Sequence, residues 1–127
     1  MILAIKTNDS TTEIYLLDVN SKVVSKKVWQ SERRLAQDLL DEIDKLINKK
    51  WRDLTGLIVF RGPGSFTGLR IGITTMNTIA YSLSLPIVGA DGANWLDDGL
   101  KRLDNNENDR ITLPEYGQAP NISKPKK

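Results

Sequence analysis

The feature of this sequence that most constrains its fold is a long segment with almost no charge. Between Gly62 and Ala90 the only charged residue is Arg70, although 27% of the whole chain is charged. A helix on the surface of a soluble protein usually carries charged side chains on its outer face. A segment without them is usually buried on more than one side, so the first helix of this chain or a second chain must cover it.

This segment opens with the sequence RGPGSFTGLRIG, residues 61–72, directly after the apolar run GLIVF. We expect a buried strand over 56–60 and a helix from Phe66 to about Ser84. One stripe of this helix is apolar and suits the sheet: Leu69, Ile73, Met76, Ala80 and Leu83. A second stripe consists mostly of small residues: Gly68, Gly72, Thr75, Ile79 and Ser82. The outer face carries the remainder: Arg70, Thr74, Asn77, Thr78 and Tyr81.

The glycine-rich turn before this helix has two interpretations. Glycines followed by a helix N-terminus can form an anion site, here with these contacts: Gly62, Gly64, Ser65, Thr67 and Gly68. The same glycines can instead let the strand and the helix pack closely. The stretch lacks the lysine of a Walker loop, and its G-x-G-x-x-x-G spacing is one residue longer than the dinucleotide-binding fingerprint. The residues favour packing and leave anion binding open.

The rest of the chain predicts a ribonuclease-H-like α/β domain. Three β-prone runs come first, at 2–5, 13–19 and 22–29, and the last two are spaced like a hairpin. An amphipathic helix over 31–50 follows, with Ser31 as its N-cap, then the strand at 56–60 and the helix already described. A buried strand at 85–90 and a short helix at 92–103 complete the series. The order β-β-β-α-β-α-β indicates a mixed sheet of about five strands in which the later strands pair parallel.

Composition excludes several kinds of chemistry. The 127 residues, enough for one domain, contain no cysteine and no histidine, so thiolate catalysis, a Ser–His pair and histidine-bound metal are excluded. We therefore assign no catalytic residue and no metal ligand. The formal net charge of +2 does not argue for nucleic-acid binding. The start of the chain does not resemble a signal peptide, and no segment approaches the ~20 apolar residues of a membrane helix. We expect a cytoplasmic protein.

The stretch RGPGSFTGLRIG closely resembles the signature of the TsaB (YeaZ) family. The resemblance extends to ILAIKTND at the start, to LLDEIDKLI over 39–47 and to LPIVGADGANWL over 85–96, and so covers roughly residues 1–103. The end, LPEYGQAPNISKPK, is similar to the C-terminal tail of the family. Members of this family are the non-catalytic partners of the TsaD subunit, which makes threonylcarbamoyladenosine (t6A) in tRNA.

The resemblance implies a fold, a role and a set of partners. The fold is one half of the actin-like and sugar-kinase-like architecture. The role is that of a scaffold for a TsaD-like catalytic subunit in t6A synthesis at tRNA position 37, without catalysis of its own. The implied partners are that subunit and the ATPase subunit of the complex, which is TsaE-like. A homodimer through the same helices is a further expectation, with tRNA contacted only indirectly and no membrane.

The sequence departs from the family pattern at several places. Lys6 stands where the family has an aspartate, and Leu35-Ala36 stands at the usual His-Ser pair. We expect the second half of the family's fold to be missing and the chain to have three parts: a domain over 1–103, a flexible linker over 104–110 in place of the second half, and a tail over 111–127 that folds back on the domain. In the family, nucleotide binds between the two halves. We therefore expect no cofactor and no appreciable ATP binding.

The outer face of the helix from Phe66, with the adjoining stripe of small residues, is our candidate partner interface. We assign to it Arg70, Gly72, Thr74, Thr75, Asn77, Thr78 and Tyr81. The depletion of charge, together with Tyr and Arg, is typical of the core of a protein–protein interface. Two other hypotheses remain: a nucleotide- or phosphate-binding enzyme that uses the loop GPGSFTG, and an accessory domain that contacts tRNA.

Overall fold

The computed structural model of the protein describes residues 1–7 and 10–115, and its centre is a mixed sheet of five strands. The strands are β1 (Ile2–Lys6), β2 (Thr11–Leu17), β3 (Val23–Gln30), β4 (Gly56–Gly62) and β5 (Ile87–Asp91). Their order across the sheet is β3-β2-β1-β4-β5, with β1, β2 and β3 antiparallel and β1, β4 and β5 parallel. This arrangement confirms the predicted ribonuclease-H-like fold.

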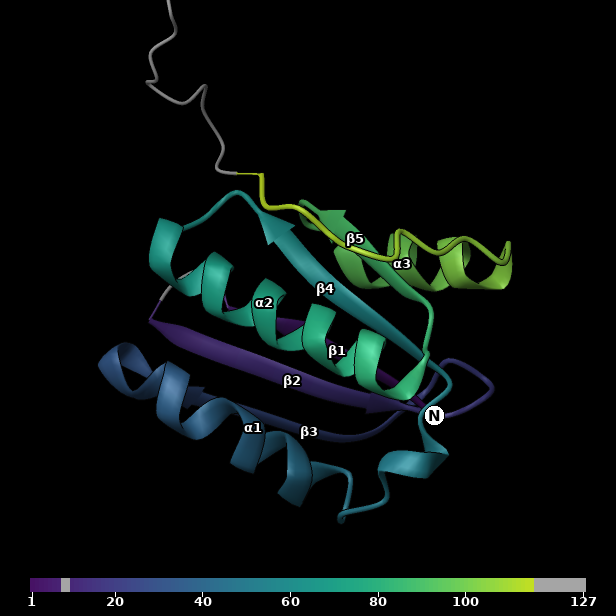
Figure 1. The fold of residues 1–127 in the computed structure, drawn as a ribbon, viewed down its shortest axis with the longest axis horizontal. Coiled ribbons are helices and arrows are strands. Elements are labelled where there is room, and N and C mark those ends of the chain that lie inside the picture. Colours follow the sequence, from purple (N-terminus) through teal and green to yellow (C-terminus); the bar gives the residue numbers. More distant parts are fainter. Residues whose placement is uncertain (8–9, 116–127) are drawn as a thin grey trace, which may run out of the picture.

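Three α-helices cover the sheet, as Figure 1 shows. Two of them, α1 (Leu35–Leu46) and α2 (Phe66–Leu83), lie side by side on one face. The third, α3 (Trp95–Asp104), packs on β4 and β5 from the other face. None of the helices in residues 1–7 and 10–115 has the length and apolar character that a bilayer crossing requires.

The core lies on both sides of the sheet. Between the sheet and the two front helices it is aliphatic, with Leu35, Leu39 and Ile43 from α1, and Leu69, Ile73, Met76 and Ala80 from the predicted stripe of α2. Leu83, the last residue of that predicted stripe, is 38% exposed. On the other face the core includes aromatic rings in addition to aliphatic side chains such as Ile58. Trp95 of α3 contacts Phe60 with ring centroids 5.8 Å apart and Tyr15 with centroids 6.1 Å apart. Both layers remove apolar surface from water, which is the main stabilising contribution.

The first helix differs from its prediction at both ends. It is preceded by a short 3-10 turn, Glu32–Arg34, and it ends at Leu46 rather than at residue 50. Ser31 is not a side-chain cap, because its buried hydroxyl shares a hydrogen bond of 2.7 Å with Thr12 of β2. Asp44, near the end of α1, accepts hydrogen bonds from Lys49 and from the Trp51 indole beyond the helix, at 2.9 and 2.7 Å, which fix the turn toward β4.

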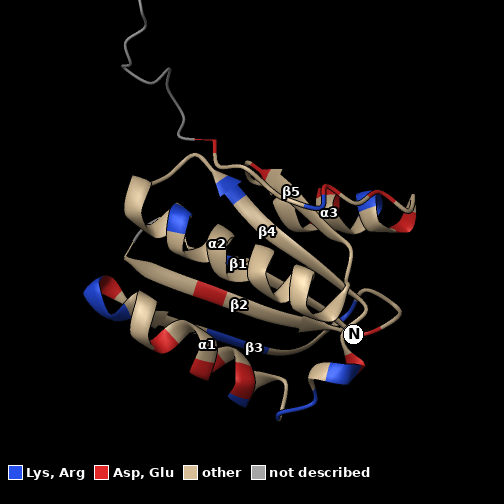
Figure 2. Cartoon of the chain, in the orientation of Figure 1, with Lys and Arg blue, Asp and Glu red and all other residues tan. Residues whose placement is uncertain are grey.

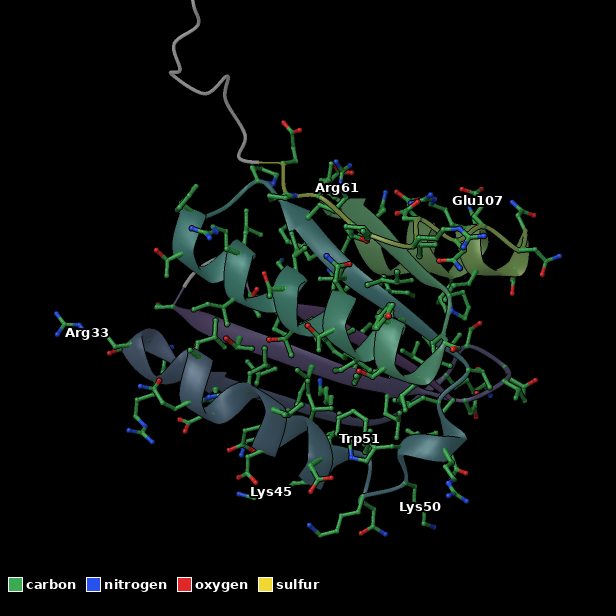
Figure 3. The ribbon with its side chains drawn as sticks, in the orientation of Figure 1. Arg33, Lys45, Lys50, Trp51, Arg61 and Glu107 are labelled. Carbon is green, nitrogen blue, oxygen red and sulfur yellow. The ribbon has the colours of Figure 1, made fainter. Side chains whose placement is uncertain are left out.

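After α3 the chain returns along β5, and we call residues 107–115 the strap. In Figure 3 it runs from the neighbourhood of Glu107 to that of Arg61. The strap satisfies the outer edge of β5: Asn108 accepts from the Ile87 amide at 3.1 Å, and the Asp109 amide donates to the Ile87 carbonyl at 2.7 Å. The Gly89 amide donates to the Asp109 carboxylate at 2.8 Å. An edge strand otherwise presents unpaired backbone groups.

The far half of the strap lies against α2 and β4. Asn77 of α2 donates to the Thr112 carbonyl at 3.0 Å and accepts from its amide at 2.9 Å. The Glu115 amide donates to the Arg61 carbonyl at 2.7 Å, and Arg61 donates to the Leu113 carbonyl at 2.9 Å. The expected linker over 104–110 and the first part of the expected tail thus bond to the domain. Residues 116–127, the rest of the expected tail, lie outside the described part. The domain boundaries stay a prediction.

Asp109 is the main anchor of the strap. Its carboxylate pairs with the Arg102 guanidinium of α3, which also donates to the Gly89 carbonyl at 2.8 Å and to Glu107 at 2.7 Å. Partial burial by itself would raise the pKa of Asp109, but the hydrogen bonds from Arg102 and from the Gly89 amide outweigh it. The pKa of this carboxyl therefore lies below its ordinary value.

This lowered pKa predicts an acid-dependent loss of stability. A carboxyl whose pKa is lower in the folded state stabilises the fold above its unfolded pKa of about 3.9, and this contribution disappears as the pH falls through the folded value. Asp109→Asn should therefore lower the free energy of unfolding at pH 6, and its difference from the original chain should shrink below about pH 4. Urea unfolding of both proteins across this range measures the effect. Asp97→Asn, at an exposed position of α3, controls for loss of a carboxylate. A difference that does not change with pH would contradict the prediction.

Candidate functional site

The glycine-rich turn connects β4 to α2, and its geometry is that of close packing. Ser65 is the N-cap of α2, because its hydroxyl accepts from the Gly68 amide at 3.2 Å. A Cβ atom at Gly68 would overlap the carbonyl oxygen of Thr7, at the end of β1. A Cβ atom at Gly72, one turn further along, would overlap the Thr7 side chain. The two glycines therefore let the first half of α2 rest directly on the end of β1.

Thr7 makes this contact specific. It is 1% exposed, and its hydroxyl donates a hydrogen bond of 2.7 Å to the Gly68 carbonyl. A buried hydroxyl needs such a partner, because burying it unpaired costs about 1–3 kcal/mol. The sequence pattern pointed to close packing but did not reveal Thr7, which lies 61 residues from Gly68 along the chain.

Gly62, at the start of the turn, allows the backbone of the strap to approach closely. Its φ angle is +133°, a conformation that L side chains rarely adopt, and a Cβ atom here would overlap the carbonyl oxygen of Glu115. Lys6, which replaces the aspartate of the resembled family, lies with its ammonium group 4.8 Å from the centre of the Phe60 ring. The predicted anion contacts at Gly62, Gly64, Ser65, Thr67 and Gly68 stay a prediction. In the described part of the chain, acidic side chains form no group of three or more that could hold a metal ion.

The outer face of α2 is exposed and almost uncharged. Arg70, Thr74, Thr78 and Tyr81 are all exposed, and Tyr81 is 89% accessible. Figure 2 shows the contrast with α1: α2 carries one basic position on an otherwise uncharged helix, whereas α1 carries acidic groups along its length. The Arg70 guanidinium lies 5.1 Å from the centre of the Phe66 ring, on the same helix. Thus α1 lies beside α2 but leaves this outer face uncovered.

Two residues that the sequence assigned to the partner interface are used within the chain. Gly72 is buried against Thr7, so it is a packing position rather than a surface position. Asn77 holds Thr112 of the strap through both ends of its amide. Helical periodicity places both residues near the outer face, but it cannot show that Thr7 or the strap covers them. Thr75 is half-buried.

Two hollows border the exposed face. One, of about 320 Å³, lies between α1 and α2 and is lined by Ala36, Thr67, Arg70, Ile71, Thr74 and Thr75. The other is a larger groove of about 730 Å³ between the second half of α2 and the strap. Thr74, Asn77, Thr78 and Tyr81 line one side of this groove, and Asn108, Arg110 and Ile111 line the other. The structure thus brings most of the predicted interface residues together around the two hollows.

Comparisons with known proteins agree with the resemblance in the sequence. A family model described as "TsaD: tRNA N6-adenosine threonylcarbamoyltransferase" matches residues 23–96, more than half of the chain. The chain is 35% identical over 89 residues to the tRNA threonylcarbamoyladenosine biosynthesis protein TsaB of Bacillus subtilis (strain 168), a match that covers 68% of this chain and 38% of that protein. It is 32% identical over 112 residues to the TsaB protein of Escherichia coli (strain K12), covering 80% of this chain and 47% of that protein.

Solved structures give the same result. YeaZ from Pseudomonas aeruginosa superposes with a TM-score of 0.65 and 26% identity, over 71% of this chain and 43% of the YeaZ chain. A second Pseudomonas aeruginosa structure, described as an uncharacterized protein with similarity to peptidase YeaZ, gives the same TM-score and identity over 42% of its chain. The present chain therefore spans less than half the length of the curated relatives it matches.

The packing of α2 on Thr7 leads to a stability prediction. At an open helix position, Gly→Ala stabilises by about 1 kcal/mol. Gly72→Ala should instead destabilise the protein, because a new methyl group in a packed site costs ~1–3 kcal/mol. Thr7→Ala removes the two side-chain atoms nearest to this methyl group, so the double variant Thr7→Ala/Gly72→Ala should be more stable than the sum of the single effects. Urea unfolding of the four proteins completes the cycle. A Gly72→Ala protein that is more stable than the original chain would show that α2 does not rest on Thr7.

The use of Ser65 as a helix cap leads to a prediction on ligand binding. The Gly68 amide, one of the donors that an anion at the start of α2 would need, is already bonded to the Ser65 hydroxyl, so we expect titration calorimetry with ATP to show no binding in the micromolar range. A micromolar affinity that disappears in Ser65→Ala or Gly64→Ala proteins would reverse this expectation and favour the anion interpretation of the loop.

Proposed function

We propose a function for this chain from its family, since the chain belongs to the TsaB (YeaZ) proteins and also matches the TsaD family model. The proposed function is that of a non-catalytic subunit that scaffolds a TsaD-like threonylcarbamoyltransferase in tRNA t6A synthesis. The names of the curated relatives support the pathway, since both are called tRNA threonylcarbamoyladenosine biosynthesis proteins. The scaffold role, the TsaD-like partner and the absence of catalysis are the proposal itself.

The observation that carries this proposal is the exposed, almost uncharged outer face of α2. Thr74, Thr78 and Tyr81 lie in a row on it, and the face borders two hollows. Charge depletion with an accessible tyrosine is the composition of an interface core rather than of a solvated helix. A partner that covered this row would complete the burial that the rest of the chain leaves unfinished.

The chemistry of the loop also supports a non-catalytic role. The chain contains no histidine or cysteine that could act as a general base or nucleophile. The glycines at the start of α2 are occupied by packing against Thr7. Lys6, in the position of the family's aspartate, does not offer a carboxylate for a metal ion. These features favour the scaffold over a nucleotide-hydrolysing enzyme.

The remaining parts of the proposal concern partners and organisation. We propose that the TsaD-like subunit is the principal partner, that a TsaE-like ATPase subunit and a homodimer are further assemblies, and that tRNA is contacted only through the complex. We also propose that residues 1–103 are the folded domain and that the chain acts in the cytoplasm. Co-purification with the catalytic subunit of the same organism, with masses measured by light scattering, tests the assembly directly.

The sharpest test of the α2 face is a charge at Thr78. This side chain is exposed, and its hydroxyl only donates to the Thr74 carbonyl of the same helix, at 2.9 Å, so Thr78→Glu should fold normally. An unpaired charge buried in an interface costs several kcal/mol, and about 1.4 kcal/mol is already a tenfold change in affinity. We expect Thr78→Glu to abolish detectable association with the TsaD-like subunit.

The control for this test is Asn105→Glu, which adds the same charge at an exposed position beyond α3. Its association should match that of the original chain, and both variants should keep the original circular dichroism spectrum. Normal association of Thr78→Glu, or loss of its folded spectrum, would remove α2 as the proposed interface.

A further inference from the structure

The larger groove has a second wall that the sequence did not assign to any interface. Asn108, Arg110 and Ile111 of the strap face the α2 row across about 730 Å³. Ile111 is 67% exposed, although it is a large aliphatic side chain, and it shares the groove with the even more exposed Tyr81. An exposed apolar residue is unremarkable alone, but two that line one hollow indicate a surface that binds something.

The position of Ile111 is fixed from both sides by contacts within the chain. On one side Asp109 is held by Arg102 and by the Gly89 amide. On the other side Thr112 is buried and bonded twice to Asn77. Because the neighbouring residues are anchored, the strap presents Ile111 to the groove without a large loss of conformational freedom when a partner binds. Such preorganisation increases affinity.

The charge of the groove indicates the chemistry of its occupant. Arg110 is the one charged residue among those that line it. No carboxylate of the described residues forms an ion pair with the Arg110 guanidinium. An occupant that carries a carboxylate beside an apolar side chain would therefore match both Arg110 and the Tyr81–Ile111 pair. Arginine and tyrosine are also the residue types that most often dominate binding energy at interfaces.

A second copy of this chain does not supply that complement. In a two-fold symmetric contact the same patch meets itself. Two such grooves placed face to face would bring together two Arg110 side chains and no carboxylate from the groove lining. Like charges at an interface disfavour the contact. The groove is therefore better suited to a different chain.

We infer that Arg110 and Ile111 of the strap form the second half of the partner-binding surface, and that the groove receives an apolar side chain flanked by a carboxylate from the TsaD-like catalytic subunit. This inference rests on the proposed function of α2 and extends that surface to the strap. It makes the strap a determinant of partner choice in addition to a cover for the edge of β5.

The chain offers a matched pair of variants for the test. Leu113 lies two residues from Ile111 and is 65% exposed, but it does not line the groove. We expect Ile111→Glu to weaken binding of the purified TsaD-like subunit at least about tenfold, as truncation of a central interface residue does. Leu113→Glu should change it less than about twofold, as for an exposed site outside an interface. Binding is measured by calorimetry or light scattering, with circular dichroism to confirm folding.

Arg110→Glu provides a second, independent arm at an exposed position. It should also weaken binding at least about tenfold, because it replaces the attraction to a carboxylate by repulsion, and the effect should be smaller at high salt. If Ile111→Glu loses its folded spectrum, Arg110→Glu alone decides the question.

The outcomes separate this inference from the proposed function. Loss of binding in Thr78→Glu with normal binding in Arg110→Glu and Ile111→Glu would overturn the inference and leave α2 as the interface. Normal binding in all three would overturn both. A change confined to the self-association of the chain, with unchanged affinity for the TsaD-like subunit, would identify a second copy as the occupant and also overturn the inference.

Discussion

The contact between α2 and the end of β1 is the constraint on which the other features of this structure depend. Gly68 and Gly72 allow the helix to rest on Thr7, and the Thr7 hydroxyl bonds to the Gly68 carbonyl at 2.7 Å. A helix seated so deeply turns Leu69, Ile73 and Met76 fully into the core. Its opposite side then projects outward as a straight row, and α1 lies beside it rather than over it. The exposed face is thus a consequence of how the helix is seated.

The strap depends on the same helix. The side-chain amide of Asn77, on α2, forms hydrogen bonds with both the carbonyl and the N–H of Thr112. These two hydrogen bonds set the distance between the helix and the strap. The other end of the strap is fixed to β5 and α3 through Asp109 and Arg102. The groove between α2 and the strap is therefore bounded by two elements that each have independent anchors. We expect a groove held in this way to keep its shape without an occupant.

The fold could be predicted from the sequence because its elements follow regular patterns. The apolar runs of the strands and the stripes of α1 and α2 gave the element order, and the predicted span of α2, Phe66 to about Ser84, agrees with the observed Phe66–Leu83. Caps and turns were harder. Ser31 has the usual residue type for a cap, but a hydroxyl on the neighbouring strand, Thr12, takes its hydrogen bond. The preference of a residue type for helix caps does not take into account a competing hydrogen-bond partner that is distant in the sequence.

The site could be predicted only in part, for the same reason. Arg70, Thr74, Thr78 and Tyr81 were placed on an outer face because helical spacing is enough to do so. Gly72 and Asn77 were assigned to the partner interface too, although each is covered by a residue that only the folded chain brings near.

The polar run DNNENDR has the composition of a solvated linker, and no periodicity marks it as structured. The side chains of Asn108 and Asp109 nevertheless accept hydrogen bonds from the backbone amides of Ile87 and Gly89 on β5. Side-chain bonds to an edge strand impose no sequence period, so only the structure reveals that this segment bonds to β5 and contributes to one wall of the groove beside α2.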